Sequence, residues 1–201
     1  MRLLALFGLL TLLAGCGAVV ATNDAPPEVI AAKAYRAPGP ATLTVMTMVS
    51  NRSGSGAHTA LMINGSQRVI FDPAGSFVNE RVPERGDVLY GVTPAVLQGY
   101  RSAHARSTYH VVSQTFVVTP EQAETALRLA MQNGPVARAF CTTATTQLLR
   151  QVPGFTDISS TMFPTNLMRQ LAARPGVETD KYFEDDAGGI IEGVAGIVIS
   201  E

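Results

Sequence analysis

One cysteine and one histidine of this sequence have the residue types that a nucleophilic site needs. Cys141 stands in the first turn of a predicted helix, where unpaired N–H groups and the positive end of the helix dipole lower the pKa of a thiol. The same N–H groups could stabilise the oxyanion of a tetrahedral intermediate. His58 follows a flexible Ser/Gly stretch, so its ring could face an open cleft and act as the base for the thiol. Cys141 and His58 therefore form a candidate catalytic pair.

A predicted hairpin supplies a third residue. Two short β-rich runs flank residues 64–66, and the Asn-Gly dipeptide between them is a strong turn signal that we expect to face solvent. If residues 64–66 form the loop, His58 faces Asp72, whose carboxylate could orient the imidazole. A two-residue turn would place Phe71 there instead. Asp72 is the favoured third residue, with Asn51 or His110 as the next candidates.

Each of these residues also has an ordinary structural interpretation. Cys141 lies on the apolar stripe of its helix and could be a buried, inert thiol, while His58 could be a structural hydrogen-bonding residue. Asp72 precedes a proline and could simply form a turn, and His104 and His110 are interpreted as surface or core residues. A zinc site from Cys141, His58 and His110 lacks a recognisable ligand spacing, so we expect neither a metal nor another cofactor. Taken together, the residues favour catalysis.

The N-terminus has the pattern of a bacterial export signal that ends in a lipidation site. Residues 3–13 are an apolar run that is too short to span a bilayer and is preceded by one arginine. The run ends in Leu-Ala-Gly-Cys16, which resembles a lipobox, and this predicts a signal peptide over 1–15 and acylation of Cys16. An ordinary secretory signal with a chance cysteine is the alternative. With Cys16 acylated, Cys141 is the only remaining thiol, so no internal disulfide can form.

Composition indicates one folded domain, and the lipobox-like sequence at Cys16 implies that lipid holds this domain at a membrane. The 201 residues suit a single domain, and the net charge of −1 gives no basic surface for nucleic acid. Residues 16–40 include a proline-rich stretch without clear periodicity, which predicts a lipidated N-terminus followed by an extended, mobile tether. The domain should then occupy 41–186, leaving a Gly-rich tail over 187–201.

The order of the predicted elements indicates an α+β fold, a small antiparallel sheet with helices packed on one side. Thr119, Pro120 and Gln122 form a capping box that begins the clearest helix, which Gly134 ends. The predicted strands cover 43–49, 58–63, 68–71, 87–90, 107–118 and 177–183, and the helices cover about ten residues from 93, then 119–133, 139–152 and 163–171.

The segments around His58 and Cys141 resemble those of a known family. Ser-Gly-Ser-Gly-Ala-His58-Thr-Ala-Leu-Met-Ile, a strand that ends at Asp72, and later Ala-Phe-Cys141-Thr-Thr-Ala-Thr-Thr-Gln-Leu-Leu are similar to the circularly permuted NlpC-type papain-like hydrolases. That group includes lecithin:retinol acyltransferase and bacterial lipoprotein amidases. The resemblance covers roughly residues 50–153 and implies a permuted papain-like fold with Cys141 as nucleophile, His58 as base and Asp72 as the third polar residue. The group usually has a polar residue slightly nearer the histidine, where this chain has Ile70.

These observations lead to one expected function and its alternatives. We expect a periplasm-facing thiol hydrolase or acyltransferase of the cell envelope, anchored to a bacterial membrane by lipid and acting on an amide or ester bond. Peptidoglycan peptides and lipids are the candidate substrates. The alternative is a non-catalytic envelope lipoprotein that serves as a binding or scaffold module on the same fold, and a metal-binding sensor is a third class.

Overall fold

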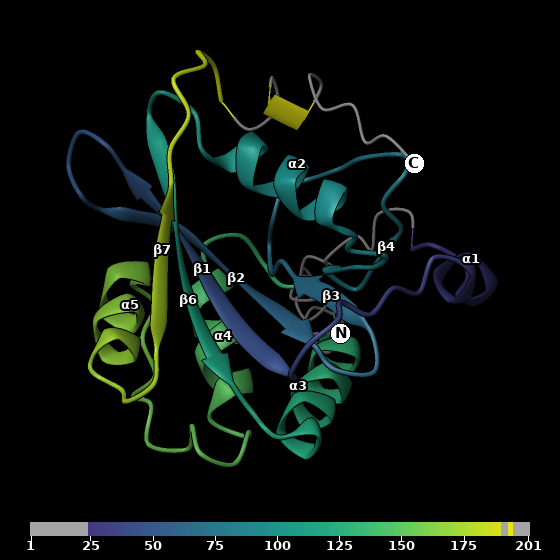
Figure 1. The fold of residues 1–201 in the computed structure, drawn as a ribbon. Coiled ribbons are helices and arrows are strands. Elements are labelled where there is room, and N and C mark those ends of the chain that lie inside the picture. The colour runs from purple at the N-terminus through teal and green to yellow at the C-terminus, as the bar shows by residue number, and fades with distance from the viewer. Residues whose placement is uncertain (1–23, 190–192, 195–201) are drawn as a thin grey trace, which may run out of the picture.

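One open seven-stranded sheet organises the part of the chain that the computed structural model describes, residues 24–189 and 193–194 (Figure 1). The strand order is β4-β5-β3-β2-β1-β6-β7, and each neighbouring pair is antiparallel. The α+β class and the antiparallel sheet are thereby confirmed. The strands are β1 (Thr42–Ser50), β2 (Gly56–Asn64), β3 (Arg68–Phe71), β4 (Glu84–Arg85), β5 (Val88–Leu89), β6 (Tyr109–Val117) and β7 (Glu178–Tyr182). The helices are α1 (Pro27–Ala32), α2 (Pro94–His104), α3 (Pro120–Asn133), α4 (Cys141–Leu149) and α5 (Pro164–Ala172).

Helices cover both faces of the sheet, so the expectation that they pack on one side was wrong. The central strand β1 is buried over its whole inner length, on both faces. Leu43 and Val45 belong to the core under α3, α4 and α5, whereas Met46 and Met48 belong to a second core under α2. A strand that is apolar on both faces needs cover on both, and α2 supplies it on the second face (Figure 1).

The β2–β3 hairpin has a different register from the expected one but keeps the same faces. Asn64 pairs with Arg68, so residues 65–67 form the loop and the pairing is displaced by two positions. Because side chains alternate with period two, this displacement leaves His58 and Asp72 on one face and makes them diagonal neighbours. The expected contact between His58 and Asp72 is therefore present although the predicted register was incorrect.

The turn of this hairpin is covered rather than open to solvent. Asn64 and Gly65 are both buried, which contradicts the expected solvent-facing turn. Helix α3 approaches the turn so closely that both the amide and the hydroxyl of Ser66 donate to the Glu124 carboxylate. The Asn-Gly signal predicted the hairpin correctly but carried no information about α3.

Residues 24–40 lie along the domain, so this part of the predicted tether is not extended away from it. The Ala25 amide donates to the Glu84 carbonyl at 2.8 Å, and the Ala37 amide donates to Asn64 Oδ1 at 3.1 Å. The short helix α1 lies between these contacts. Backbone groups of the segment find partners on β2 and β4, which proline content alone does not predict.

Local capping chemistry sets the helix starts that position the site. The Thr119–Gln122 capping box is present at the start of α3, and the Thr93 side chain caps α2. Helix α4 begins at Cys141, and its N-cap Phe140 makes no side-chain capping bond. The N–H groups of the first turn of α4 are therefore left for another acceptor beside the thiol.

The chain termini fall largely outside the described residues. The predicted signal at 1–15 and the predicted lipidation site Cys16 lie outside the described residues. Of the predicted Gly-rich tail, Gly193 lies against α2, where an added Cβ would come within 2.8 Å of the Ala103 Cα. Within the described ranges, no helix has both the length and the hydropathy that a membrane span requires.

Candidate active site

Three distant segments bring Cys141, His58 and Asp72 together. His58 projects from β2, Asp72 immediately follows β3, and Cys141 opens α4, which packs on β2 through a hydrogen bond between the hydroxyls of Thr59 and Thr142. The charge of His58 and the backbone N–H of Thr59 both act on the Cys141 thiol and lower its pKa, and the thiol lies 3.8 Å from the Thr142 hydroxyl. The structure thus groups the three residues that the sequence singled out.

Asp72 contacts the nitrogen of the His58 ring that does not face the thiol. His58 Nε2 lies 2.6 Å from Asp72 Oδ1, so Nδ1 is the nitrogen that remains for the thiol. Tyr100 on α2 donates its hydroxyl to the same Oδ1 at 2.7 Å. The carboxylate is 3% exposed, and burial strengthens both contacts because water does not compete for them.

The turn after β3 leaves no space beside the Asp72 carboxylate. The Gly75 amide donates to the Asp72 carbonyl at 2.9 Å, closing the turn. A Cβ at Gly75 would lie 1.9 Å from Asp72 Oδ2, a distance that no side chain tolerates. Glycine is therefore required at position 75 for the Asp72 carboxylate to occupy the position in which it contacts His58.

Mutual interaction shifts the pKa values of the site toward a charged pair. Burial alone would raise the pKa of Cys141, but the hydrogen bond and charge of His58, with smaller contributions from the Thr59 N–H and the Thr142 hydroxyl, lower it to about 7. Burial would lower the pKa of His58, but the Asp72 carboxylate and the Cys141 thiol raise it to about 10. Burial opposes the charge on Asp72 as well, yet His58 holds the pKa of Asp72 below its usual value. A thiolate and an imidazolium therefore coexist near neutral pH.

Two residues near the site were missed or undervalued in the sequence. Tyr100 and His104 lie one turn apart on the buried face of α2. The centroid of the His104 ring is 4.2 Å from that of the Tyr100 ring and 6.1 Å from that of the His58 ring. Burial lowers the pKa of His104 to about 4, so this imidazole is neutral. Their signal was a pair of polar aromatic rings at helical spacing on an otherwise apolar face.

The other candidates for the third role lie apart from His58. His110 Nδ1 and Asn51 Oδ1 are 2.7 Å from each other, and the His110 ring stacks on Phe183. No cluster of three or more His, Cys, Asp or Glu residues that could hold a metal occurs within 24–189 and 193–194. The described part of the chain therefore groups a thiol, an imidazole and a carboxylate, and the zinc alternative has no set of ligands there.

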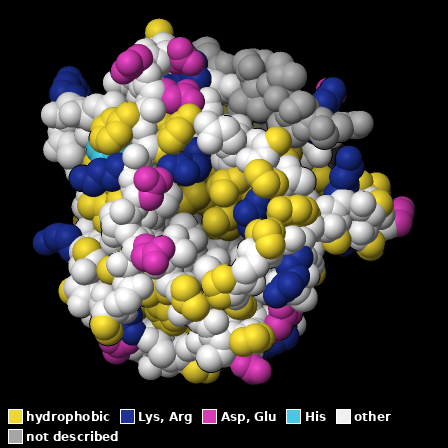
Figure 2. Space-filling view, viewed as in Figure 1, with side chains coloured by type: hydrophobic (Ala, Val, Ile, Leu, Met, Phe, Trp, Pro, Cys, Tyr) yellow, Lys and Arg dark blue, Asp and Glu magenta, His cyan; other side chains and the backbone are white. Residues whose placement is uncertain are grey.

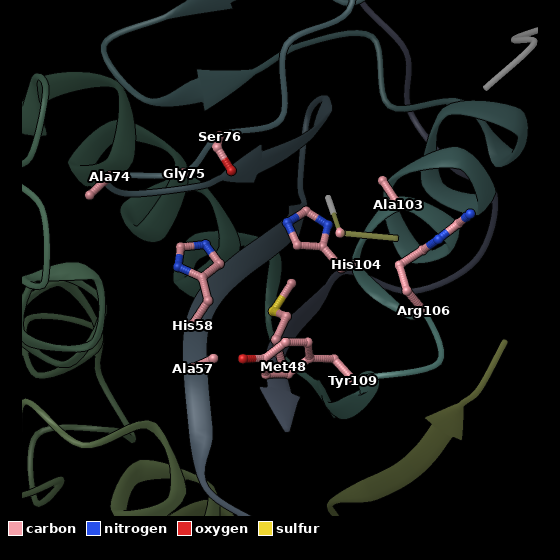
Figure 3. A pocket seen from close by; sticks show the side chains of 11 residues that line it. Met48, Ala57, His58, Ala74, Gly75, Ser76, Ala103, His104, Arg106 and Tyr109 are labelled. Atoms are coloured by element: carbon pink, nitrogen blue, oxygen red, sulfur yellow. The ribbon is translucent and has the colours of Figure 1, made fainter. Parts of the chain in front are cut away.

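A pocket adjoins the imidazole of His58 on the side of α2 (Figure 3). It has a volume of about 280 Å³, and its walls include His58, His104, Ser76, Tyr109 and Met48. Bound groups could thus reach the ring that contacts the thiol.

Comparison of the chain with protein-family models, curated proteins and solved structures finds no match.

Proposed function

We propose that the protein is a thiol hydrolase or acyltransferase that uses Cys141 as nucleophile and His58 as general acid and base. The observation that carries the proposal is the grouping of three residues from distant segments: His58 lies 2.6 Å from Asp72 and lowers the pKa of the Cys141 thiol. A nucleophile, a base and a group that orients the base form the minimal set for covalent acyl transfer.

In the proposed mechanism, the Cys141 thiolate attacks the carbonyl carbon of an amide or ester. N–H groups of the first turn of α4 stabilise the resulting oxyanion, since the Phe140 cap leaves them without a side-chain partner. The His58 imidazolium then gives its proton to the departing amine or alcohol, leaving an acyl-thioester. His58 next removes a proton from water or an acceptor alcohol, whose oxygen attacks the thioester carbonyl. The C–S bond then breaks, which releases the acid or ester and returns the Cys141 thiolate beside the His58 imidazolium.

The proposed class is the permuted papain-like group, in which the histidine strand precedes the cysteine helix. Three features support it: β2 with His58 precedes α4 with Cys141, the helix N-terminus adjoins the strand, and a carboxylate orients the ring. With lipid on Cys16, the domain would act in a bacterial cell envelope, facing the periplasm, on peptidoglycan peptides or on lipids. The face of the molecule in Figure 2 carries Lys/Arg and Asp/Glu side chains interspersed, without a single-sign area for nucleic acid.

The test is formation of an acyl-enzyme on Cys141. Wild-type protein incubated with p-nitrophenyl acetate should release a burst of p-nitrophenolate and carry an acetyl group on the Cys141 peptide by mass spectrometry. Cys141→Ala should show neither, His58→Gln should acetylate at least about 10²-fold more slowly, and His110→Gln should match the wild type. A wild-type protein without the adduct would instead favour a binding or scaffold module.

A further inference from the structure

The pocket beside His58 contains a buried polar atom without a partner. His104 projects from α2 toward His58 and Ser76, across the pocket (Figure 3). Its side chain is only 7% exposed, and its Nε2 has no hydrogen-bond partner. A buried acceptor left unsatisfied is costly, so its retention calls for a specific explanation.

The tautomer of His104 defines what Nε2 can bind. His104 Nδ1 lies 2.7 Å from the Tyr100 carbonyl oxygen, which can only accept, so Nδ1 carries the proton. Nε2 of this neutral ring is then a bare acceptor. The partner that it lacks must be a hydrogen-bond donor.

The remaining walls select a neutral, mostly apolar partner. Met48, Ala57 and Tyr109 contribute apolar surface to the pocket. Arg106, the one lining residue with a permanent charge, is paired through Nη1 with Glu184 at 3.5 Å and Asp186 at 3.6 Å, while its buried Nε has no hydrogen-bond partner. His58 is held by Asp72 at 2.6 Å. The volume of about 280 Å³ exceeds the roughly 10–15 Å³ that a cavity needs to hold one water.

We propose that this pocket binds a neutral, apolar segment of the substrate that bears one hydrogen-bond donor, a hydroxyl or an amide N–H, which His104 Nε2 accepts. That the ligand is part of the substrate rests on the proposed function. His58 forms one wall of the pocket and Cys141 does not line it, so the His58 ring would separate the bound segment from the bond that Cys141 attacks. The pocket therefore distinguishes substrates by a donor at this position.

Two isomeric probes test the assignment: 1-pentanol, which has a donor, and butyl methyl ether, which has none. Both are titrated into the ¹⁵N-histidine-labelled Cys141→Ser full chain and followed by NMR. Pentanol should bind at least about fivefold more tightly than the ether, since only pentanol satisfies the buried acceptor. Pentanol should also shift the ¹⁵N resonance of His104 Nε2, which the ether should leave nearly unchanged.

Two variants control the measurement. His104→Phe should bind the two isomers equally, because the acceptor is gone. Ala57→Leu, at an exposed position on the pocket wall, should weaken both isomers alike and keeps the test valid if His104→Phe does not fold. Equal affinity of the isomers in the presence of His104, an unmoved Nε2 resonance, or no binding of either would overturn the proposal. Because the thiol is absent from this assay, failure to acetylate Cys141 with isomer discrimination intact would refute only the proposed function.

Discussion

Replacing His58 with glutamine should raise the pH at which Cys141 becomes reactive by more than one unit. In the wild type the pKa of Cys141 is lowered to about 7, so iodoacetamide alkylation should rise with pH through a midpoint near 7. An ordinary thiol has a pKa of about 8.5. At pH 7 the ionised fraction would fall from about one half to about 3%, a decrease of about 16-fold. The Thr59 N–H should retain some of the depression, while burial opposes it.

The assay is the second-order rate of alkylation between pH 5 and 10, read by intact mass and scored by its midpoint. The midpoint is preferred to a single rate because a thiolate of higher pKa is intrinsically more nucleophilic, which partly masks the loss of ionised thiol. His110→Gln is the matched control, since it removes an imidazole that pairs with Asn51 rather than with the thiol, and its midpoint should stay near 7. A His58→Gln midpoint that coincides with the wild type would refute the coupling. A wild-type thiol that reacts only after denaturation would mean that Cys141 is an inert core residue.

Three further predictions follow from the site and the N-terminus. Asp72→Asn should raise the pH midpoint of Cys141 alkylation and slow acetylation of Cys141 by at least about tenfold. Its melting temperature should stay nearly unchanged, because asparagine has the shape of aspartate. Full activity of this variant would mean that another residue orients His58. Gly75→Ala should reproduce the midpoint change and lower the free energy of unfolding in urea by about 3 kcal/mol or more, since its Cβ displaces the Asp72 carboxylate. Gly176→Ala is the matched control, because Gly176 has a φ of +74° but open space around it. This variant should lower the free energy of unfolding by only about 1–2 kcal/mol and leave the alkylation midpoint unchanged. Cys16→Ser should release the protein from membranes and abolish the lipid mobility shift, and persistent membrane fractionation would contradict the lipoprotein prediction.

The elements of this fold that depend on local chemistry could be predicted from the sequence. The Thr119 cap, Pro120 and the Gln122 reciprocal bond lie within four residues, so α3 was placed correctly. The cover on the second face of the sheet was missed because helices were expected on one side only, although the apolar residues of 43–49 occupy both faces of the strand. Met46 and Met48 are as deeply buried as Leu43, which shows that the apolar content of a central strand has to be counted on both faces.

The site could be predicted only as far as strand parity and helix position allowed. His58 and Asp72 share a face in any register displaced by an even number of residues, so their contact did not depend on the exact loop. Tyr100 reaches the same carboxylate from α2, 28 positions further along the chain, and no periodicity within one element encodes that distance. His104 was interpreted as an ordinary surface or core residue because the tautomer and the orphaned nitrogen exist only in the folded chain.

The docking of residues 24–40 on the domain shortens the tether that would connect a lipid on Cys16 to the domain. Asp24 is already attached, because its carboxylate accepts from the Gly86 amide at 2.9 Å. If Cys16 carries lipid, eight residue steps separate it from Asp24, and a fully extended chain of that length reaches at most about 29 Å, against about 86 Å for a tether that runs to Pro40. A lipid-anchored domain held within that distance would sample the bilayer surface and the layer just above it, so bonds at the height of the lipid headgroups would come within reach more often than bonds deep in the cell wall.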